Sequence, residues 1–218
     1  MEQAGSGLGT ARPRVLMILN NAPDYREPFL RELSREVDLT LVARPCEPDG
    51  LTPPTERVGY RYLEIPAKRF LGFLWQPGLS QVVDEGDWDT LGVSLNMRDI
   101  GRILLFLRHK ALRSRWVWWG HVFGRTPLKL LDRLRSFLLT RGAGALVFTE
   151  GVAQEVRERY GVEATAFNNT QVKEEEFRPG SFEEHPGLRL LFVGRLQPRK
   201  RLERLVALAE RDSRVAVR

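Results

Sequence analysis

Short apolar runs alternate with segments of helical spacing along most of the chain. The first run, RVLMILN at residues 14–20, has the uninterrupted apolar character of a strand that is buried in a parallel sheet. The next segment places Phe29, Leu30 and Leu33 on one side of a helix over residues 25–36. The same alternation predicts further strands at 37–43, 60–66, 88–96, 115–120, 144–149 and 163–167, and helices at 98–112, 127–140 and 151–159.

Strands separated by helices predict an α/β fold, a Rossmann-like open parallel sheet with right-handed crossovers. Ligands of such sheets bind beyond the carboxyl ends of the strands, so the residues that directly follow a strand are the candidates for a site. The strand at 115–120 carries Trp116, Trp118 and Trp119. These rings could stack on a sugar, but aromatic side chains on a buried strand more often fill the core.

The pattern changes after residue 167. Residues 168–187 are polar, acidic and rich in turn formers, which predicts a linker. A strand at 188–193, a helix at 200–210 and one more strand follow, and these cannot bury a core of their own. We therefore expect a disordered lead-in at 1–13, a first domain at 14–180, and a linker with the truncated start of a second Rossmann-like domain at 181–218.

The net charge of +6 is concentrated in one block of the chain. Residues 98–141 hold eleven Arg or Lys against Asp99 and Asp132. Such a block could face phosphates, acidic lipids or nucleic acid, or it could be a solvated helix face. One alternative function is therefore a basic surface module that binds nucleic acid or an acidic membrane without catalysis.

The number of cysteines and the lengths of the apolar runs indicate in which cellular compartment we expect the protein. Cys46 is the only cysteine, so no internal disulfide can form and a reducing compartment fits. No His, Cys or Asp cluster has metal-ligand spacing, and no apolar run approaches the length of about 20 residues that a membrane span needs. These observations predict a cytoplasmic protein, with a place at the inner membrane surface left open.

The most basic turn of the chain lies where a predicted strand meets a predicted helix, in LLFVGRLQPRK at residues 190–200. Free backbone N–H groups and the helix dipole attract anions at such a position. Arg195 can grip a phosphate with two hydrogen bonds, and Lys200 supplies a movable point charge. The turn therefore suits a diphosphate, although charge alone is equally compatible with a basic surface turn.

FVGRLQPRKRLERLV resembles the G-R-L-x-x-x-K-G segment of retaining, GT-B-fold glycosyltransferases of family four. Gly194, Arg195, Leu196 and Lys200 match that segment in place, whereas Arg201 stands where the family usually has glycine. The resemblance implies that Gly194, Arg195 and Lys200 bind the diphosphate of a nucleotide-sugar donor. Two other stretches agree with it, because WWGHVFGR is similar to the W-x-H-G loop of the family and NNTQVKEEEFRPG to its interdomain linker. The first of these implies that His121 lies at the catalytic centre.

The stretch NNAPDYREPFLREL, after the first strand, resembles the opening loop and helix of family members with a YR-x-P start. Asn21, Tyr25 and Arg26 follow the strand and could line an acceptor pocket. Asp24 and Glu27 fit a capping box at the start of the first helix, which is a purely structural role.

The resemblance implies a retaining enzyme that moves a sugar from a nucleotide-sugar to an acceptor hydroxyl, with no metal or other cofactor. The acceptor would be a glycan, a lipid-linked molecule or a small molecule, with peripheral membrane contact and no nucleic acid partner. The E-x7-E donor motif of the family would lie beyond Arg218, so we expect an incomplete fragment with weak donor binding. The chain lacks G-x-G-x-x-G after its first strand, a P-loop and G-x-S-x-G, which argues against a dehydrogenase, a P-loop ATPase and a serine hydrolase.

Overall fold

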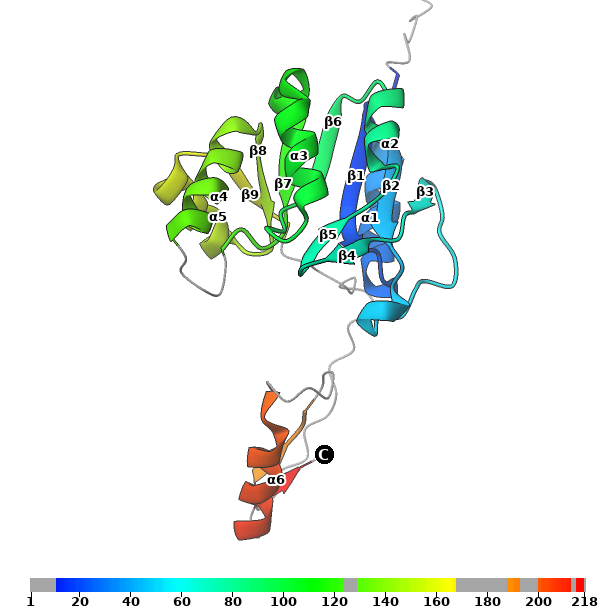
Figure 1. Ribbon diagram of the computed structural model, residues 1–218. Helices are drawn as coiled ribbons and strands as arrows, with labels where there is room; N and C mark the ends of the chain where they lie inside the picture. Colours follow the sequence, from blue (N-terminus) through cyan, green and yellow to red (C-terminus); the bar gives the residue numbers. More distant parts are fainter. Residues whose placement is uncertain (1–10, 124–128, 168–187, 193–199, 213–214, 218) are drawn as a thin grey trace, which may run out of the picture. The chain divides into compact units, whose positions relative to one another are not determined.

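The computed structural model describes residues 11–123, 129–167, 188–192, 200–212 and 215–217. The chain divides into two compact units, Met1–Lys173 and Glu174–Arg218. Over the described residues the first unit holds one seven-stranded parallel sheet with helices packed against it (Figure 1). This confirms the predicted Rossmann-like α/β fold class.

The strand order across this sheet is β3-β2-β1-β6-β7-β8-β9. From β1 the chain first builds outward through β2 to β3, and it then returns to the other side of β1 with β6. An open sheet has its topological switch point where the direction of building reverses, here between β1 and β6. The strands are β1 (Arg14–Asn21), β2 (Asp38–Arg44), β3 (Arg61–Glu64), β6 (Thr90–Ser94), β7 (Trp116–Trp119), β8 (Gly144–Val147) and β9 (Ala164–Ala166).

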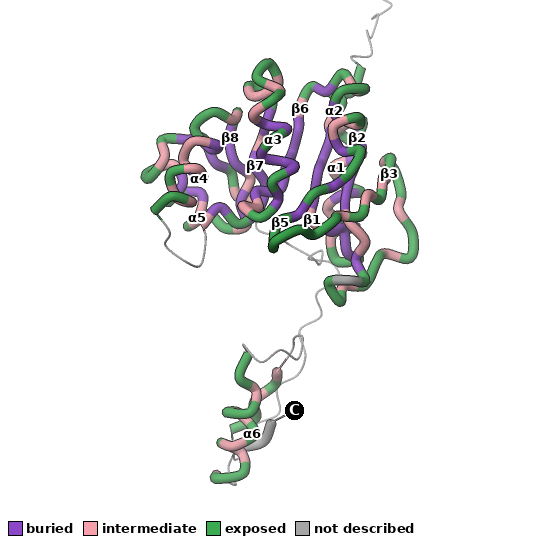
Figure 2. Tube along the Cα trace, viewed as in Figure 1, coloured by how far each residue is buried: buried purple, intermediate pink, exposed green. Residues whose placement is uncertain are grey.

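Two apolar clusters fill the two faces of the sheet, and the central strands are buried over most of their length (Figure 2). Leu16 and Ile18 of β1 belong to one cluster and Met17 and Leu19 to the other, because successive side chains of a strand point to opposite faces. Helix α1 (Glu27–Glu36) contributes to the second cluster through Leu30. The helices that contribute buried residues to the first cluster are α2 (Leu79–Glu85), α3 (Ile100–Arg108), α4 (Lys129–Arg141) and α5 (Glu150–Tyr160).

The tryptophans of β7 are core residues. Trp116 and Trp118 are fully buried on the face that α3 and α4 cover, and Trp119 is buried on the other face. The indole N–H of Trp118 donates a hydrogen bond to the Leu138 carbonyl at 2.8 Å. The core interpretation of these rings is confirmed, and stacking on a sugar is wrong for them because no ring face is left to solvent.

The start of α1 (Glu27–Glu36) differs from the predicted capping box. A 3-10 turn over Asp24–Arg26 precedes the helix, and no side chain caps it. The Glu27 carboxylate instead accepts hydrogen bonds from the Tyr60 hydroxyl at 2.5 Å and the Val58 backbone N–H at 3.2 Å. The capping box is wrong because this carboxylate is buried and holds the segment before β3 against the helix.

The connection between β3 and β6 contains structure that the pattern did not predict. An antiparallel hairpin, β4 (Lys68–Phe70) and β5 (Phe73–Trp75), precedes α2. The predicted helix at 98–112 is also shorter in the structure. It ends at Arg108, and a 3-10 helix over Lys110–Arg115 leads into β7.

The second unit contains a parallel β–α–β arrangement among its described residues. β10 (Leu188–Leu190) pairs in parallel with β11 (Val215–Val217), and α6 (Leu202–Arg211) connects them. The strand predicted at 188–193 is thus present over Leu188–Leu190, and the helix predicted at 200–210 is present over Leu202–Arg211. The predicted linker at 168–187 lies outside the described residues.

Candidate functional site

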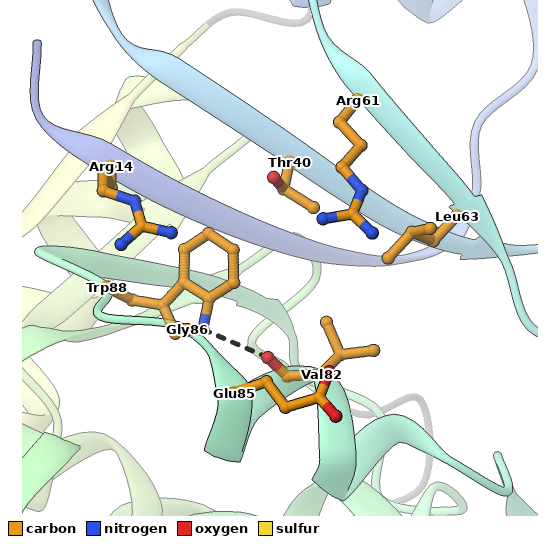
Figure 3. A pocket seen from close by; sticks show the side chains of 8 residues that line it. All are labelled: Arg14, Thr40, Arg61, Leu63, Val82, Glu85, Gly86 and Trp88. Atoms are coloured by element: carbon orange, nitrogen blue, oxygen red, sulfur yellow. Dashed lines mark hydrogen bonds between the residues drawn. The ribbon is translucent and has the colours of Figure 1, made fainter.

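A small hollow of about 80 Å³ lies near the amino ends of the strands (Figure 3). Trp88 is one of the residues that line it, with its indole N–H donating to the Val82 carbonyl at 3.3 Å and the Arg14 guanidinium 5.3 Å from its ring. Open parallel sheets bind ligands at the opposite edge. The functional site is therefore expected at the carboxyl edge.

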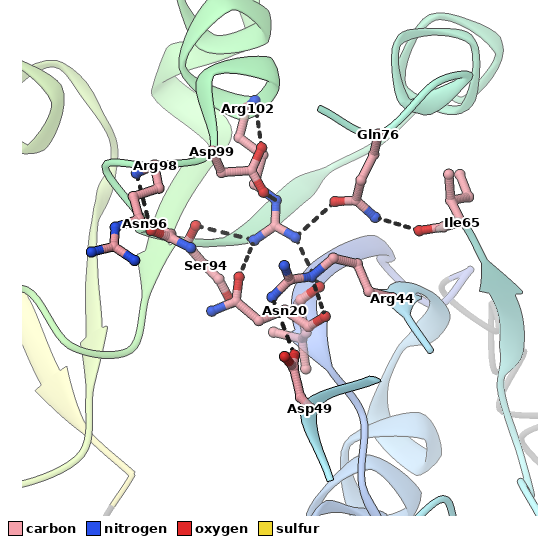
Figure 4. Close-up of polar contacts among 11 residues, drawn as sticks. Asn20, Arg44, Asp49, Ile65, Gln76, Ser94, Asn96, Arg98, Asp99 and Arg102 are labelled. Carbon is pink, nitrogen blue, oxygen red and sulfur yellow. Dashed lines mark hydrogen bonds and ion pairs between the residues drawn. The ribbon is translucent and has the colours of Figure 1, made fainter. Parts of the chain in front are cut away.

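A buried arginine of α3 occupies the switch point at that edge (Figure 4). The Arg102 side chain is only 1% exposed, although a guanidinium is rarely buried without partners. Each of its terminal nitrogens donates two hydrogen bonds. The acceptors are the Leu19 carbonyl at 2.9 Å, Asn20 Oδ1 at 2.9 Å, Gln76 Oε1 at 2.9 Å and the Ser94 carbonyl at 3.4 Å.

Asp99 completes the partners of Arg102. It is fully buried, and its Oδ2 lies 3.0 Å from Arg102 Nε in an ion pair. Its Oδ1 accepts from the Arg102 backbone N–H, which caps α3. Burial lowers the pKa of Arg102 to about 10, Asp99 opposes that shift, and Arg44 adds to it. The guanidinium is therefore charged at neutral pH, and it ties β1, β6, α3 and the segment before α2 together.

Beside this anchor lies a pocket of about 670 Å³. Its charged lining consists of Arg44, Arg69, Arg98 and Asp49, a net charge of +2. Arg44 is mostly occupied, because its Nε donates to the Asn20 carbonyl at 3.0 Å and its terminal nitrogen lies 3.8 Å from Asp49. Leu71, Gly72, Phe73, Leu74 and Asn96 form the rest of the wall.

Arg69 and Arg98 make the pocket suited to an anion. Within the part of the chain that the structure describes, neither guanidinium has a hydrogen bond or ion pair to a protein group. Arginine presents a planar fork of donors that matches phosphate and carboxylate oxygens. The pocket can therefore bind a phosphate or carboxylate group at the carboxyl edge.

The residues predicted to line an acceptor pocket have different surroundings. Asn21 is buried, and its amide donates to the Pro45 carbonyl at 2.8 Å, so it has a structural partner. Tyr25 is 37% exposed. The Arg26 guanidinium lies 5.9 Å from the Tyr25 ring and 5.8 Å from the Trp119 ring. Its buried Nε has no hydrogen-bond acceptor among the described residues.

His121 follows β7 and is exposed at the carboxyl edge. Its ring lies 4.5 Å from Phe148, which in turn lies 5.0 Å from Phe167. Phe167 stacks on Trp119 at 4.3 Å, and Trp119 is the ring beneath Arg26. A continuous series of aromatic contacts thus joins His121 to Arg26, so the structure brings these two predicted site residues to one edge.

The residues predicted to bind a donor diphosphate divide between described and undescribed parts of the chain. Gly194 and Arg195 lie outside the described residues. Lys200 is exposed directly before Arg201, whose φ of 52° precedes α6. This is the left-handed region, which glycine adopts without steric cost. The backbone therefore gives a physical reason for the glycine that the resembling motif usually has at this position.

The basic block at 98–141 is not one solvated face. Besides the buried Arg102, Arg113 donates to the Phe106 and Leu107 carbonyls and Arg115 to the Trp88 carbonyl. Arg135 is buried and bonds Asp132 at 3.0 Å. Much of this charge holds the fold together, which leaves less of it for an external polyanion.

The sequence pattern alone predicted no role in a site for Arg44, Arg69, Arg98 or Arg102. Arg44 and Arg98 follow the strands predicted at 37–43 and 88–96, so the rule on strand ends could have found them. Arg69 gave no such signal, because it lies in the unpredicted hairpin. Arg102 gave none either, because it is one of eleven basic residues in the block at 98–141.

Across the described residues, no three His, Cys, Asp or Glu side chains come together as metal ligands would. Cys46 is buried, and burial raises the pKa of its thiol. None of the helices in the described ranges has the length and apolarity of a membrane span.

Comparison with models of known protein families finds no match to this chain, and no curated protein matches it.

Proposed function

We propose that this chain carries the acceptor-side domain and the opening of the donor domain of a nucleotide-sugar-dependent glycosyltransferase. The observation that carries the proposal is the start of α6 in the second unit. Lys200 precedes the helix, and Arg201 adopts the left-handed backbone at the position where the resembling motif has glycine. The doubly wound sheet of the first unit and the β–α–β arrangement of the second support the same interpretation.

In this function the bond from the anomeric carbon to the diphosphate breaks while the acceptor oxygen forms a new bond to that carbon, and the proton of the acceptor hydroxyl passes to the departing diphosphate. Negative charge grows on the departing diphosphate. Lys200 and Arg195 stabilise that charge together with the N-terminal end of α6. Because a preorganised cation acts only where the charge develops, it lowers the barrier to transfer rather than merely holding the donor.

The carboxyl edge of the first unit holds the acceptor. Arg26 and His121 sit at the two ends of the aromatic contacts through Trp119 and Phe148. A sugar ring or other polar acceptor can contact the exposed faces of Tyr25 and His121 there. His121 is the group that we assign to the reaction centre.

Sugar transfer by the protein tests the proposal. A set of UDP-, GDP- and ADP-sugars is offered with candidate acceptors, and glycosylated product is detected by mass spectrometry. Lys200→Gln should lower kcat/KM by about a hundredfold or more, because one donor to a developing anion contributes that much. Arg204→Gln, an exposed arginine of the same helix, serves as the matched control. The proposal fails if no nucleotide-sugar is consumed, or if both variants behave alike.

A further inference from the structure

The β4–β5 hairpin exposes large apolar side chains to solvent. Phe70 is 76% exposed, Leu71 81%, Phe73 46% and Trp75 45%. Every residue of β4 is exposed, and in β5 only Leu74 is buried (Figure 2). Scattered exposed apolar residues are normal on a protein surface, but four within six consecutive positions form a contiguous patch, which is typical of an interaction site.

The apex of the hairpin is also unusual in its backbone. Leu71 and Gly72 both have positive φ, 47° and 83°, as in a two-residue type I′ turn. Such turns favour Asn-Gly or Asp-Gly, because a side chain larger than these is strained in the left-handed region. Folding alone therefore gives no reason for a leucine at a turn position that is 81% exposed. An external contact does.

Positive charge flanks this apolar apex. Lys68 and Arg69 lie in β4, and Arg98 faces the hairpin across the pocket. The acidic group of the pocket is Asp49, and it lies 3.8 Å from Arg44. Trp75 packs over Gly101 at the start of α3, which holds the hairpin to the body of the first unit. The patch thus has exposed apolar side chains at its tip and positively charged side chains beside them. The contact of Trp75 with α3 fixes the hairpin on the first unit.

We propose that the β4–β5 hairpin docks on the surface of an anionic phospholipid bilayer. Phe70 and Leu71 enter the boundary between headgroups and acyl chains, and Trp75 lies at headgroup depth as interfacial tryptophans do. Arg69 and Arg98 contact lipid phosphates from the pocket beside the hairpin. The docking is independent of the proposed sugar transfer.

Charge favours this occupant over a second copy of the chain. A two-fold contact between hairpins would oppose like patches, so the arginines of one copy would face those of the other. An anionic membrane offers the opposite charge and an apolar interior at the same surface. Such a membrane therefore matches the apolar side chains and the arginines of the patch at the same time.

Tryptophan fluorescence gives a direct test, because Trp75 is the exposed member of the five tryptophans. The other four, Trp88, Trp116, Trp118 and Trp119, are all at most 6% exposed. The protein is mixed with vesicles of phosphatidylcholine alone, or with phosphatidylglycerol replacing part of it. We expect a blue shift and quenching by brominated acyl chains with the anionic vesicles only. Trp75→Phe should remove that signal while cosedimentation persists.

Two sets of variants, each with a matched control, separate docking from folding. Leu71→Asn supplies the residue that the turn prefers, so it should keep the hairpin yet weaken vesicle binding by about tenfold. Leu130→Asn, at a position 77% exposed on α4, should leave vesicle binding unchanged. Arg69→Gln and Arg98→Gln should each weaken it about fivefold, and the exposed Arg133→Gln should not.

Several outcomes would overturn the proposal. The first is equal binding to neutral and anionic vesicles, or none to either. The second is vesicle binding by Leu71→Asn that matches the unchanged protein. The third is a concentration-dependent dimer in ultracentrifugation that Leu71→Asn abolishes without any vesicle binding, which would make a second copy the occupant.

Discussion

Replacing the buried arginine of α3 provides the sharpest test of how the carboxyl edge is held together. Arg102→Met keeps a long side chain but removes the charge and every donor. It leaves Asp99 as an uncompensated charge at 0% exposure, and it leaves the Asn20, Gln76 and Leu19 oxygens without their donor. Breaking one side of a buried pair costs about 3–5 kcal/mol. We expect the free energy of unfolding to fall by about 4 kcal/mol, a large part of a typical total of about 5–15 kcal/mol.

The assay is urea unfolding followed by both circular dichroism and tryptophan fluorescence. Arg108→Met is the matched control, because Arg108 lies on the same helix with a side chain 67% exposed and an ion pair of 3.7 Å to Asp84. That exposed pair should contribute less than about 1 kcal/mol. A loss for Arg102→Met that does not exceed the loss for Arg108→Met would refute the reasoning.

A double variant identifies the source of the loss. Asp99→Asn retains the cap of α3, since asparagine caps as well as aspartate, but removes the negative charge. Combined with Arg102→Met, it should cost at least about 1 kcal/mol less than the two single losses added together, because the uncompensated charge is gone. Strict additivity would mean that the ion pair between Asp99 and Arg102 contributes nothing.

Three further changes probe other parts of the fold. Gly86→Ala would place a Cβ inside the Trp88 ring and should cost about 1–3 kcal/mol in urea unfolding. Burial and the hydrogen bond to Glu27 raise the pKa of Tyr60 to about 12, so its stabilisation is present below pH 10.0 and lost as the pH rises toward 12. Tyr60→Phe should flatten that loss in unfolding experiments across the pH range. Arg201→Gly should strengthen amide-exchange protection in α6 by about 1 kcal/mol, because glycine relieves the positive φ.

The pattern of apolar residues predicted the sheet well, because parallel strands that are buried on both faces have uninterrupted apolar sequences. β1, β2 and β6 are found within two residues of the predicted bounds. The hairpin β4–β5 was not predicted, because four of its apolar residues are exposed and its turn is Leu-Gly rather than Asn-Gly or Asp-Gly. Periodicity reports burial, so an apolar segment that faces solvent does not fit its rules.

The site was only partly predictable for a related reason. His121 and Arg26 follow strands, and sequence order alone placed them at the carboxyl edge. The acceptors that meet around Arg102 come from elements that lie far apart in the sequence, and Gln76 belongs to a segment that no pattern marked. Which arginine is buried depends on tertiary packing, which a run of basic letters does not reveal.

The pairing of β1 with β6 has a consequence for synthesis on the ribosome. Val15 pairs with Thr90, and the bond from Arg102 to the Leu19 carbonyl spans 83 residues. β1 emerges early and finds β2 soon, yet its other edge stays open until β6 has left the exit tunnel. An open, apolar strand edge is a template for wrong pairing. The nascent chain should therefore depend most on chaperones during the interval between the emergence of β2 and that of α3.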